Sequence, residues 1–263
     1  MIGEIWSFAE FPAAYEGLLS RSGLPRASAE FLHELAARVP LVAASVVVDA
    51  GCYDASQSEF LVHATGCRLI GIDLSRLGAE ARRQAMTDPS LRGRVRFVQG
   101  RLEALPIRTA TADLTWCRDA ISCAPATTVV PELTRITRPH GHVILHTTCA
   151  TPLLEPRERA WLYDTLAIAA ESMDKRTLEG TLTEAGLRIV EHVRVGSQSL
   201  QARTEHGDVN EHLLRVARLH EYCDDYVQQW GDAWYQRILA WETWPIYTAL
   251  DKLEDHIWLL EAT

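Results

Sequence analysis

Two acidic residues, each at the end of a short apolar run, are the side chains in this sequence whose type and spacing best suit chemistry. Asp49 ends a run of valines, and Asp73 ends the run RLIGID, 24 residues further along the chain. A carboxylate accepts two hydrogen bonds side by side, so an acid at the end of a strand can hold both hydroxyls of a ribose. We therefore expect Asp73 to bind a ligand that carries a ribose.

The turn after Asp49 contains a single glycine, Gly51, whereas many nucleotide-binding turns contain two or three. A helix N-terminus that binds a pyrophosphate requires the full pattern G-x-G-x-x-G, and that pattern is missing here. An acidic turn with one glycine favours a ligand without phosphate. A dehydrogenase-type turn and a degenerate pocket are the two alternatives.

Two further side chains are candidates for acid–base chemistry at the ends of later strands. His146 lies at the carboxyl end of the run HVILHT, and Asp119 follows the run that ends at Cys117. Either group is of a type that removes a proton from a reacting atom, and a structural histidine and a helix cap are the alternatives. His142 and His146 are about 13 Å apart along a strand, at about 3.3 Å per residue, too far to share a metal ion. We predict no metal site.

Aromatic side chains at helical spacing offer a lid over a bound substrate. The faces of such rings attract cations, including sulfonium and amine groups. A helical core made of the same side chains is the alternative reading. The candidates for binding the substrate are Trp161, Tyr163, Trp234 and Tyr235.

The order of the apolar runs predicts a doubly wound α/β sheet. Short β-branched runs are typical of buried parallel strands, and segments with helical spacing separate most of them. Ligands of such sheets bind beyond the carboxyl ends of the strands. We expect the third of the helices named below to end because of Pro139. The expected strands are residues 45–49, 68–73, 95–99, 112–117, 142–147, 187–195 and 256–263, and the expected helices are 56–64, 75–86, 129–137 and 178–185.

Three segments fall outside this alternation of strands and helices. Residues 1–40 are predicted to form helices that close the ligand site, and residues 201–250 a helical cap that binds the second substrate. A smaller helical insertion is expected at residues 152–173. The sheet domain then consists of residues 41–200 and 251–263.

Composition excludes several classes of protein. The chain has 263 residues, of which 47% are hydrophobic, and its net charge of −9 argues against a nucleic-acid backbone as the partner. No apolar run approaches the roughly 20 residues that cross a bilayer, and the first residues lack the bases of a secretory signal. The six cysteines are too scattered for a disulfide scaffold or paired zinc motifs. We expect a cytoplasmic protein with neither a nucleic-acid nor a membrane partner.

The motifs, taken in order, resemble those of class I S-adenosylmethionine-dependent methyltransferases that act on small molecules. VVDAGC matches the first motif of that family, GIDLS the second, and VQGRLEALP the third, which flanks the adenine. ADLTWCRDAI matches the strand beside the methyl donor, and ELTRITRPHGHVIL matches the helix, turn and strand that follow. The resemblance covers roughly residues 32–195 and extends to the closing strand HIWLLEAT.

The resemblance implies a Rossmann-like sheet of seven strands, S-adenosyl-L-methionine as the cofactor and S-adenosyl-L-homocysteine as the product. It also implies that residues of the N-terminal helices close the cofactor site. The cofactor-binding residues that it implies are Asp49, Gly51, Cys52, Tyr53, Asp73, Leu74, Arg101, Leu102, Glu103 and Cys117, together with Tyr15 and Arg21 from the N-terminal segment.

The sequence departs from the family at two places. Tyr53 and Ala55 stand where the family usually has glycines. Arg101 stands where the family commonly has an acid or amide that accepts a hydrogen bond from the adenine amino group. Arginine has no acceptor, so Glu103 or a backbone carbonyl must supply that contact.

We expect methyl transfer to a small-molecule acceptor, in the biosynthesis of a metabolite or natural product, with His146 and Asp119 as catalytic residues. The acceptor atom, nitrogen, oxygen or carbon, stays open. One alternative is an enzyme of the same fold that uses the bound cofactor without methyl transfer, in a cyclisation, decarboxylation or rearrangement. Another is a non-catalytic partner subunit whose pocket is closed by Tyr53. Exposed aromatics on the cap also suggest a homodimer.

Overall fold

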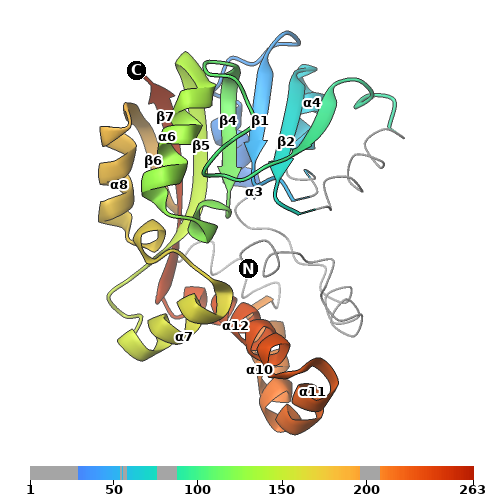
Figure 1. Ribbon diagram of the computed structural model, residues 1–263, viewed down its shortest axis with the longest axis vertical. Coiled ribbons are helices and arrows are strands. Elements are labelled where there is room, and N and C mark those ends of the chain that lie inside the picture. Colours follow the sequence, from blue (N-terminus) through green and yellow to red (C-terminus); the bar gives the residue numbers. More distant parts are fainter. Residues whose placement is uncertain (1–28, 54, 56–57, 76–87, 196–207) are drawn as a thin grey trace.

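The computed structural model describes residues 29–53, 55, 58–75, 88–195 and 208–263. This part of the chain forms a sheet with helices on both faces and a group of helices below the sheet in the view of Figure 1. Residues 1–28 and most of the expected helix 75–86 lie outside the described residues. The predictions for these residues stay predictions.

The described residues contain a sheet of seven strands in the order β3-β2-β1-β4-β5-β7-β6. The order reverses direction between β1 and β4, and this is the switch point at which sheets of this kind bind ligands. The predicted fold class is confirmed. The strands are β1 (Val46–Ala50), β2 (Arg68–Asp73), β3 (Val95–Gln99), β4 (Ala112–Arg118), β5 (Thr137–Ala150), β6 (Leu187–Val195) and β7 (Leu253–Ala262).

The sheet is mixed rather than wholly parallel, because β7 runs antiparallel to both of its neighbours, β5 and β6. The chain returns from the last helix at the carboxyl end of β5, where Leu253 pairs with Ala150. The Thr151 N–H donates to the Lys252 carbonyl at 3.0 Å and closes this junction. A strand that enters the sheet at the carboxyl end of its neighbour must run in the opposite direction.

Helices cover the two faces of the sheet, as Figure 1 shows for α6 and α8 in front and α3 behind. The helix before β5 ends at Ile136, three residues before Pro139, and not at the expected residue 137. A proline disfavours helical backbone in the residue before it, so the chain is already extended when it reaches Arg138. The helices are α3 (Ala29–Ala36), α4 (Glu59–Thr65), α6 (Ala126–Ile136), α7 (Pro156–Leu166), α8 (Lys175–Glu184), α10 (Asp208–Glu221), α11 (Cys223–Trp230) and α12 (Asp232–Ala249), with short 3-10 helices η2 (Ile121–Cys123) and η3 (Ala170–Met173).

Alternate residues of the central strands supply two separate cores. On β5, Val143 and Leu145 pack with residues of α6 and α8, while Ile144 points to the opposite face. There it joins Leu32 and Leu35 of α3, which are 1% exposed. Burial of each such side chain contributes about 1.5–3 kcal/mol. The strand ends are therefore held from both sides, and the groups beyond them are positioned rigidly.

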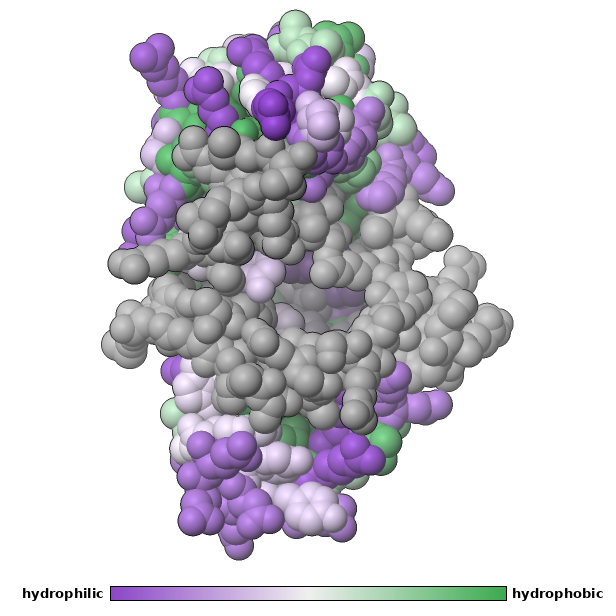
Figure 2. Space-filling view, turned by 90° about the vertical axis from the view of Figure 1, so that its right-hand side faces the viewer, coloured by the Kyte–Doolittle hydropathy of each residue, from purple (hydrophilic) through white to green (hydrophobic). Residues whose placement is uncertain are grey.

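The helical cap consists of α7, α10, α11 and α12. Leu162 of α7 and Ala240 of α12 share a core with Leu253 of β7, which ties the cap to the sheet. Leu219 of α10 and Ile238 of α12 belong to a second core. Figure 2 shows hydrophilic side chains gathered at the upper and lower ends of the face that is turned toward the viewer. None of the described helices has both the length and the apolar character that a membrane span requires.

A buried charge network joins α10 to α12 and was not predicted. The Glu242 side chain is fully buried, and one of its oxygens lies 2.7 Å from His212 Nδ1 and 3.4 Å from Arg215 Nη1. Arg215 also contacts Glu211 at 2.8 Å. Removal of one partner from a buried network typically costs about 3–5 kcal/mol, so these residues fix the register of the two helices.

Two histidines meet between β6 and β7. His192 Nε2 lies 2.9 Å from His256 Nδ1, and the His192 ring stacks on Trp258 at 4.9 Å. Burial, the neighbouring His192 and the cations Lys175 and Arg194 lower the pKa of His256 to about 3. Burial therefore outweighs the contact of His256 Nε2 with Glu254 at 2.9 Å. The folded protein holds His256 in its neutral form.

We expect acid to destabilise the fold through His256. Because its pKa is lower in the folded chain than the ordinary value of 6.5, the unfolded chain binds more protons as the pH falls from 6.5 towards 3. The folding equilibrium constant should fall by up to about tenfold per pH unit in that window. Urea unfolding of the His256→Gln variant should show a weaker loss of stability below pH 6.5. The exposed His220→Gln variant is the control, and an unchanged pH dependence in His256→Gln would contradict the assignment.

Candidate functional site

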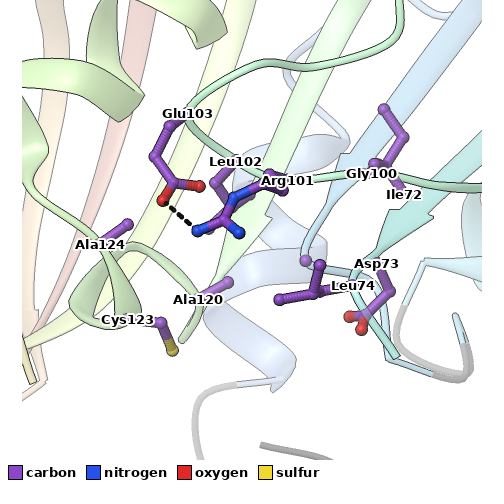
Figure 3. A pocket seen from close by; sticks show the side chains of 11 residues that line it. Ile72, Asp73, Leu74, Gly100, Arg101, Leu102, Glu103, Ala120, Cys123 and Ala124 are labelled. Atoms are coloured by element: carbon purple, nitrogen blue, oxygen red, sulfur yellow. Dashed lines mark hydrogen bonds and ion pairs between the residues drawn. The ribbon is translucent and has the colours of Figure 1, made fainter. Parts of the chain in front are cut away.

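A pocket opens at the carboxyl ends of β1, β2 and β4, where the order of strands reverses. It holds about 520 Å³ of empty space, part of which is open to solvent. Figure 3 shows Asp73 on one side of it and Glu103 on the other. Its lining residues are Gly51, Ile72, Asp73, Leu74, Gly100, Arg101, Leu102, Glu103, Ala120, Cys123 and Ala124.

The turn between β1 and α4 forms one wall of this pocket. Gly51 has φ +81°, and the N–H groups of Gly51 and Cys52 both donate to the Ile72 carbonyl, at 2.8 and 3.0 Å. A Cβ atom on Gly51 would lie 2.2 Å from that of Ala120. Glycine is thus required at residue 51 for two reasons, its positive φ and the lack of room for a Cβ atom beside Ala120. The wall is complete without a second glycine.

Asp73 is held in place by backbone groups. Its Oδ2 accepts from the Tyr53 N–H and its Oδ1 from the Ser75 N–H, both at 2.8 Å. A carboxylate oxygen has two lone pairs, so each oxygen can accept a further hydrogen bond from a ligand. Asp73 therefore fits the ribose-binding role that its position suggested.

Tyr53 and Ala55 adopt the left-handed conformation that glycine would adopt freely, with φ of +49° and +56°. Such a conformation costs about 1–2 kcal/mol for a residue with a Cβ. The Tyr53 side chain is 39% exposed and is absent from the described lining of the pocket. The departure from glycine therefore strains the turn but leaves the described part of the pocket open.

Arg101 and Glu103 form a pair at the rim of the pocket. Arg101 Nη2 lies 3.2 Å from Glu103 Oε1, and Figure 3 shows the arginine reaching across to the carboxylate. Leu102, between them in the sequence, also lines the pocket. Glu103 thus supplies an acceptor close to the position where the family carries an acid or amide.

Four of the described residues that we expected to bind the cofactor are not among the residues that line the pocket. Besides Tyr53 they are Asp49, Cys52 and Cys117. Asp49 is buried and accepts from Ser58 Oγ at 2.5 Å, so it fixes the start of α4. Burial, with Asp49 nearby, raises the pKa of the Cys117 thiol. Asp49, Cys52 and Cys117 are buried near the strand ends that carry the lining of the pocket.

The loop after β4 supplies three lining residues that sequence reasoning missed, namely Ala120, Cys123 and Ala124. They sit on and around η2, directly after Asp119, which has φ +54°. Burial raises the pKa of the Cys123 thiol to about 12, so this side chain presents a neutral surface. Small residues beside the turn are the only sequence signal for this wall.

His146 of β5 and Asp119, the residue after β4, meet beside the carboxyl end of β4, and β5 continues beyond His146 to Ala150. His146 Nδ1 lies 3.1 Å from Asp119 Oδ1, and the Asp119 N–H donates to the His146 carbonyl at 2.9 Å. The other oxygen of Asp119 lies 3.3 Å from Arg118 Nε. Burial opposes the charged form of His146, but the adjacent Asp119 outweighs it and the pKa of His146 is raised. The two predicted catalytic residues therefore form one unit next to Ala120 of the pocket.

The aromatic candidates pack largely inside the cap. Tyr163 and Tyr235 are buried in its two cores, and burial raises the pKa of each phenol to about 12. Trp161 is partly buried and donates to Gln236 at 3.2 Å, and the guanidinium of Arg237 lies over the ring of Trp234 at 5.2 Å. The structure does not bring these four rings together at the pocket. Tyr15 and Arg21 lie outside the described residues.

The described residues contain no group of three or more His, Cys, Asp or Glu side chains arranged to hold a metal ion. All six cysteines fall within the described ranges and are free thiols. The chemistry available at the site is therefore that of Asp73, the Arg101–Glu103 pair and the His146–Asp119 unit. This is an arrangement for binding and for proton transfer.

Comparisons with known proteins agree with this geometry. A family model described as a methyltransferase domain matches residues 48–145. The malonyl-(acyl-carrier protein) O-methyltransferase of Enterobacter lignolyticus is 33% identical over 183 residues, which make up 68% of this chain and 67% of that protein. The structure of geranyl diphosphate C-methyltransferase from Streptomyces coelicolor, with Mg²⁺, geranyl diphosphate and S-adenosyl-L-homocysteine, matches with a TM-score of 0.65 at 13% identity, over 90% of this chain and 79% of that one. The cyclase SpnF matches with a TM-score of 0.68 at 14% identity, over 92% and 83% of the two chains.

The chain belongs to the class I S-adenosylmethionine-dependent methyltransferases. The sequence match carries this assignment, and the two solved structures show the fold. The predicted family and class of enzyme are confirmed.

We expect Gly51→Ala to destroy the cofactor pocket. The substitution combines the strain of φ +81° with a contact at 2.2 Å to Ala120, so overpacking of about 1–3 kcal/mol adds to the strain. Calorimetric titration with S-adenosylhomocysteine should show a loss of affinity of more than about tenfold, that is, about 1.4 kcal/mol.

Gly231→Ala is the matched control, because Gly231 has the same φ and nothing lies within 4 Å of its added Cβ. It should lower the melting temperature but leave the affinity unchanged. Equal affinities in the two variants would contradict the role of Gly51.

Proposed function

We propose that this methyltransferase binds S-adenosyl-L-methionine in the pocket at the ends of β1, β2 and β4 and methylates a small molecule in the biosynthesis of a metabolite or natural product. The observation that carries the proposal is the carboxylate of Asp73, fixed by two backbone N–H groups beside the Gly51 turn. The malonyl-(acyl-carrier protein) and geranyl diphosphate after which two similar methyltransferases are named support a biosynthetic acceptor.

Each wall of the pocket has a part in holding the cofactor. The lone pairs of Asp73 would take the ribose hydroxyls, and Glu103 would take the adenine amino group. The open backbone at Gly51 leaves room for the methionine part, with Ala120 opposite. When bound, the cofactor supplies an electrophilic methyl group, and the protein contributes mainly alignment and proximity.

His146 and Asp119 would act on the acceptor. An adjacent carboxylate raises the pKa of His146, which makes the ring a stronger base for removing a proton from the acceptor. Asp119 orients the ring through its contact with Nδ1 and would stabilise the imidazolium. Asp119 precedes Ala120, which lines the pocket, so the pair stands next to the cofactor.

The remaining parts of the chain would enclose the acceptor. We assign residues 1–40, with Tyr15 and Arg21, to closing the cofactor site, and residues 152–173 and 201–250 to the acceptor side. Trp161 and Trp234 keep partly exposed rings that are available for contact with the acceptor.

The cell compartment and the assembly state also belong to the proposal. Six free thiols support a reducing compartment such as the cytoplasm. Leu213, Leu214 and Tyr222 of the cap are about half exposed and support a homodimer through this surface. Light scattering of the purified chain tests the second point.

We expect Asp73→Asn to weaken binding of S-adenosylmethionine and S-adenosylhomocysteine by about 10- to 100-fold. Hydrogen bonds to a charged group are worth about 1.5–3 kcal/mol, and an amide nitrogen cannot accept from a hydroxyl. Calorimetric titration of the full chain measures the change. The control is Asp164→Asn, which removes an exposed carboxylate on α7 and should bind both ligands normally. No binding of either ligand to the unmodified chain would overturn the assignment of the pocket.

Tyr53→Gly separates a working pocket from a closed one. Since Tyr53 is absent from the described lining and carries left-handed strain, its removal should change the affinity by less than about threefold, under 1 kcal/mol. The same titration measures it, together with the melting temperature. A large gain in affinity would instead favour the non-catalytic alternative, in which tyrosine blocks the site.

A further inference from the structure

The Nε2 atom of His146 has no partner in the part of the chain that the structure describes. The residue is 3% exposed, and this atom is buried. A buried polar atom without a hydrogen-bond partner destabilises the folded chain, and a ligand that bonds to it removes that cost. The other nitrogen, Nδ1, faces Asp119, so Nε2 is the atom left for a ligand. His146 pairs with Arg118, the last residue of β4, and so lies level with the carboxyl end of that strand, where ligands of this fold bind.

A second carboxylate lies on the same face of the sheet. Thr148 pairs with Asp255 of β7, and His146 pairs with Ile257, so these four residues share one face. Thr148 Oγ1 donates to Asp255 Oδ1 at 2.6 Å and fixes that carboxylate. Asp255 and Asp119 both favour the charged form of His146.

The charges that reach the ring are mostly negative. Among the described residues, Asp119 and Asp255 are opposed by one cation, Arg118, which is itself paired with Asp119 at 3.3 Å. His256 points from the opposite face of the sheet and is held neutral. A positive or neutral group is therefore favoured beside His146, and an anion is repelled.

We propose that the acceptor is a nucleophile that carries a proton, an amine or a hydroxyl, and not a carboxylate. This inference rests on the proposed function. At neutral pH a carboxylate has no proton for Nε2 to take, and its charge would meet Asp119 and Asp255. An amine or hydroxyl both fills the hydrogen-bonding vacancy at Nε2 and gives up a proton there.

The proton and electron balance of the step is complete with these groups. The acceptor nitrogen or oxygen forms a bond to the methyl carbon, and the carbon–sulfur bond breaks with its electron pair going to sulfur. The acceptor proton passes to His146 Nε2, and Asp119 and Asp255 stabilise the imidazolium. The proton then leaves to solvent when the product is released. No oxidant, reductant or metal is required.

Asp255 is a positioning residue in this scheme, since it acts through the charge state of His146. The Asp255→Asn variant should lower the pKa of His146, read from the pH titration of its ring signals by NMR. Asp119→Asn should lower it further because Asp119 touches the ring. Asp164→Asn should leave it unchanged. A merely structural Asp255 would move the melting temperature without moving this titration.

The class of acceptor is tested with three simple probes on the full chain in the presence of S-adenosylhomocysteine. Ethylammonium, phenol and acetate represent an amine, a hydroxyl and a carboxylate, and each is titrated to its solubility limit while the ring signals of His146 are followed. We expect ethylammonium or phenol to shift these signals and acetate to have little effect. A larger response to acetate than to both others, or no response to ethylammonium and phenol, overturns the inference.

This experiment distinguishes a failure of the proposed function from a failure of the acceptor assignment. Loss of the proposed function appears as a failure of S-adenosylhomocysteine to bind in calorimetry of the same sample. Loss of the acceptor assignment appears in the order of the three probes, which is read from His146 and needs no turnover.

Discussion

The contact between Gly51 and Ala120 is the constraint on which the rest of the ligand site depends. It brings the turn after β1 against the loop after β4, with room for no Cβ at residue 51. The same turn bonds to the Ile72 carbonyl and, through the Tyr53 N–H, to Asp73. Three strand ends are thereby locked into one wall. Asp73 at the end of β2 and the His146–Asp119 unit beside the end of β4 take their places relative to this wall.

Much of the site could be predicted, because parallel strands place their carboxyl ends at one edge. That rule was enough to select Gly51, Asp73 and the segment after Gly100, which line one pocket, and to select His146 and Asp119, which the structure brings into contact. It could not find Ala120 or Cys123, since small neutral side chains carry no chemical signal. Their position depends on the left-handed backbone at Asp119, which only the structure shows.

Other features depend on contacts between distant parts of the chain. The direction of β7 follows from where the cap returns to the sheet, and the strand's own sequence is equally compatible with either direction. Tyr163 and Tyr235 have the spacing of either a lid or a core, and packing between helices decides for the core. The partners of Glu242 come from α10, about 30 residues earlier, so that no local pattern reveals them.

The place of β7 has a consequence for how the protein is made. β6 has β7 as its neighbour in the sheet, and β7 follows the whole cap in the sequence. During synthesis, β5 and β6 must therefore wait with unpaired edges until the ribosome has released the cap and the residues after it. An unpaired apolar edge is a template for aggregation, and the charged residues Arg188, Glu191 and Arg194 on β6 are the kind of side chain that protects one. The nascent chain thus depends on its last described strand to complete the sheet, and chaperones have most to protect in the interval before that strand emerges.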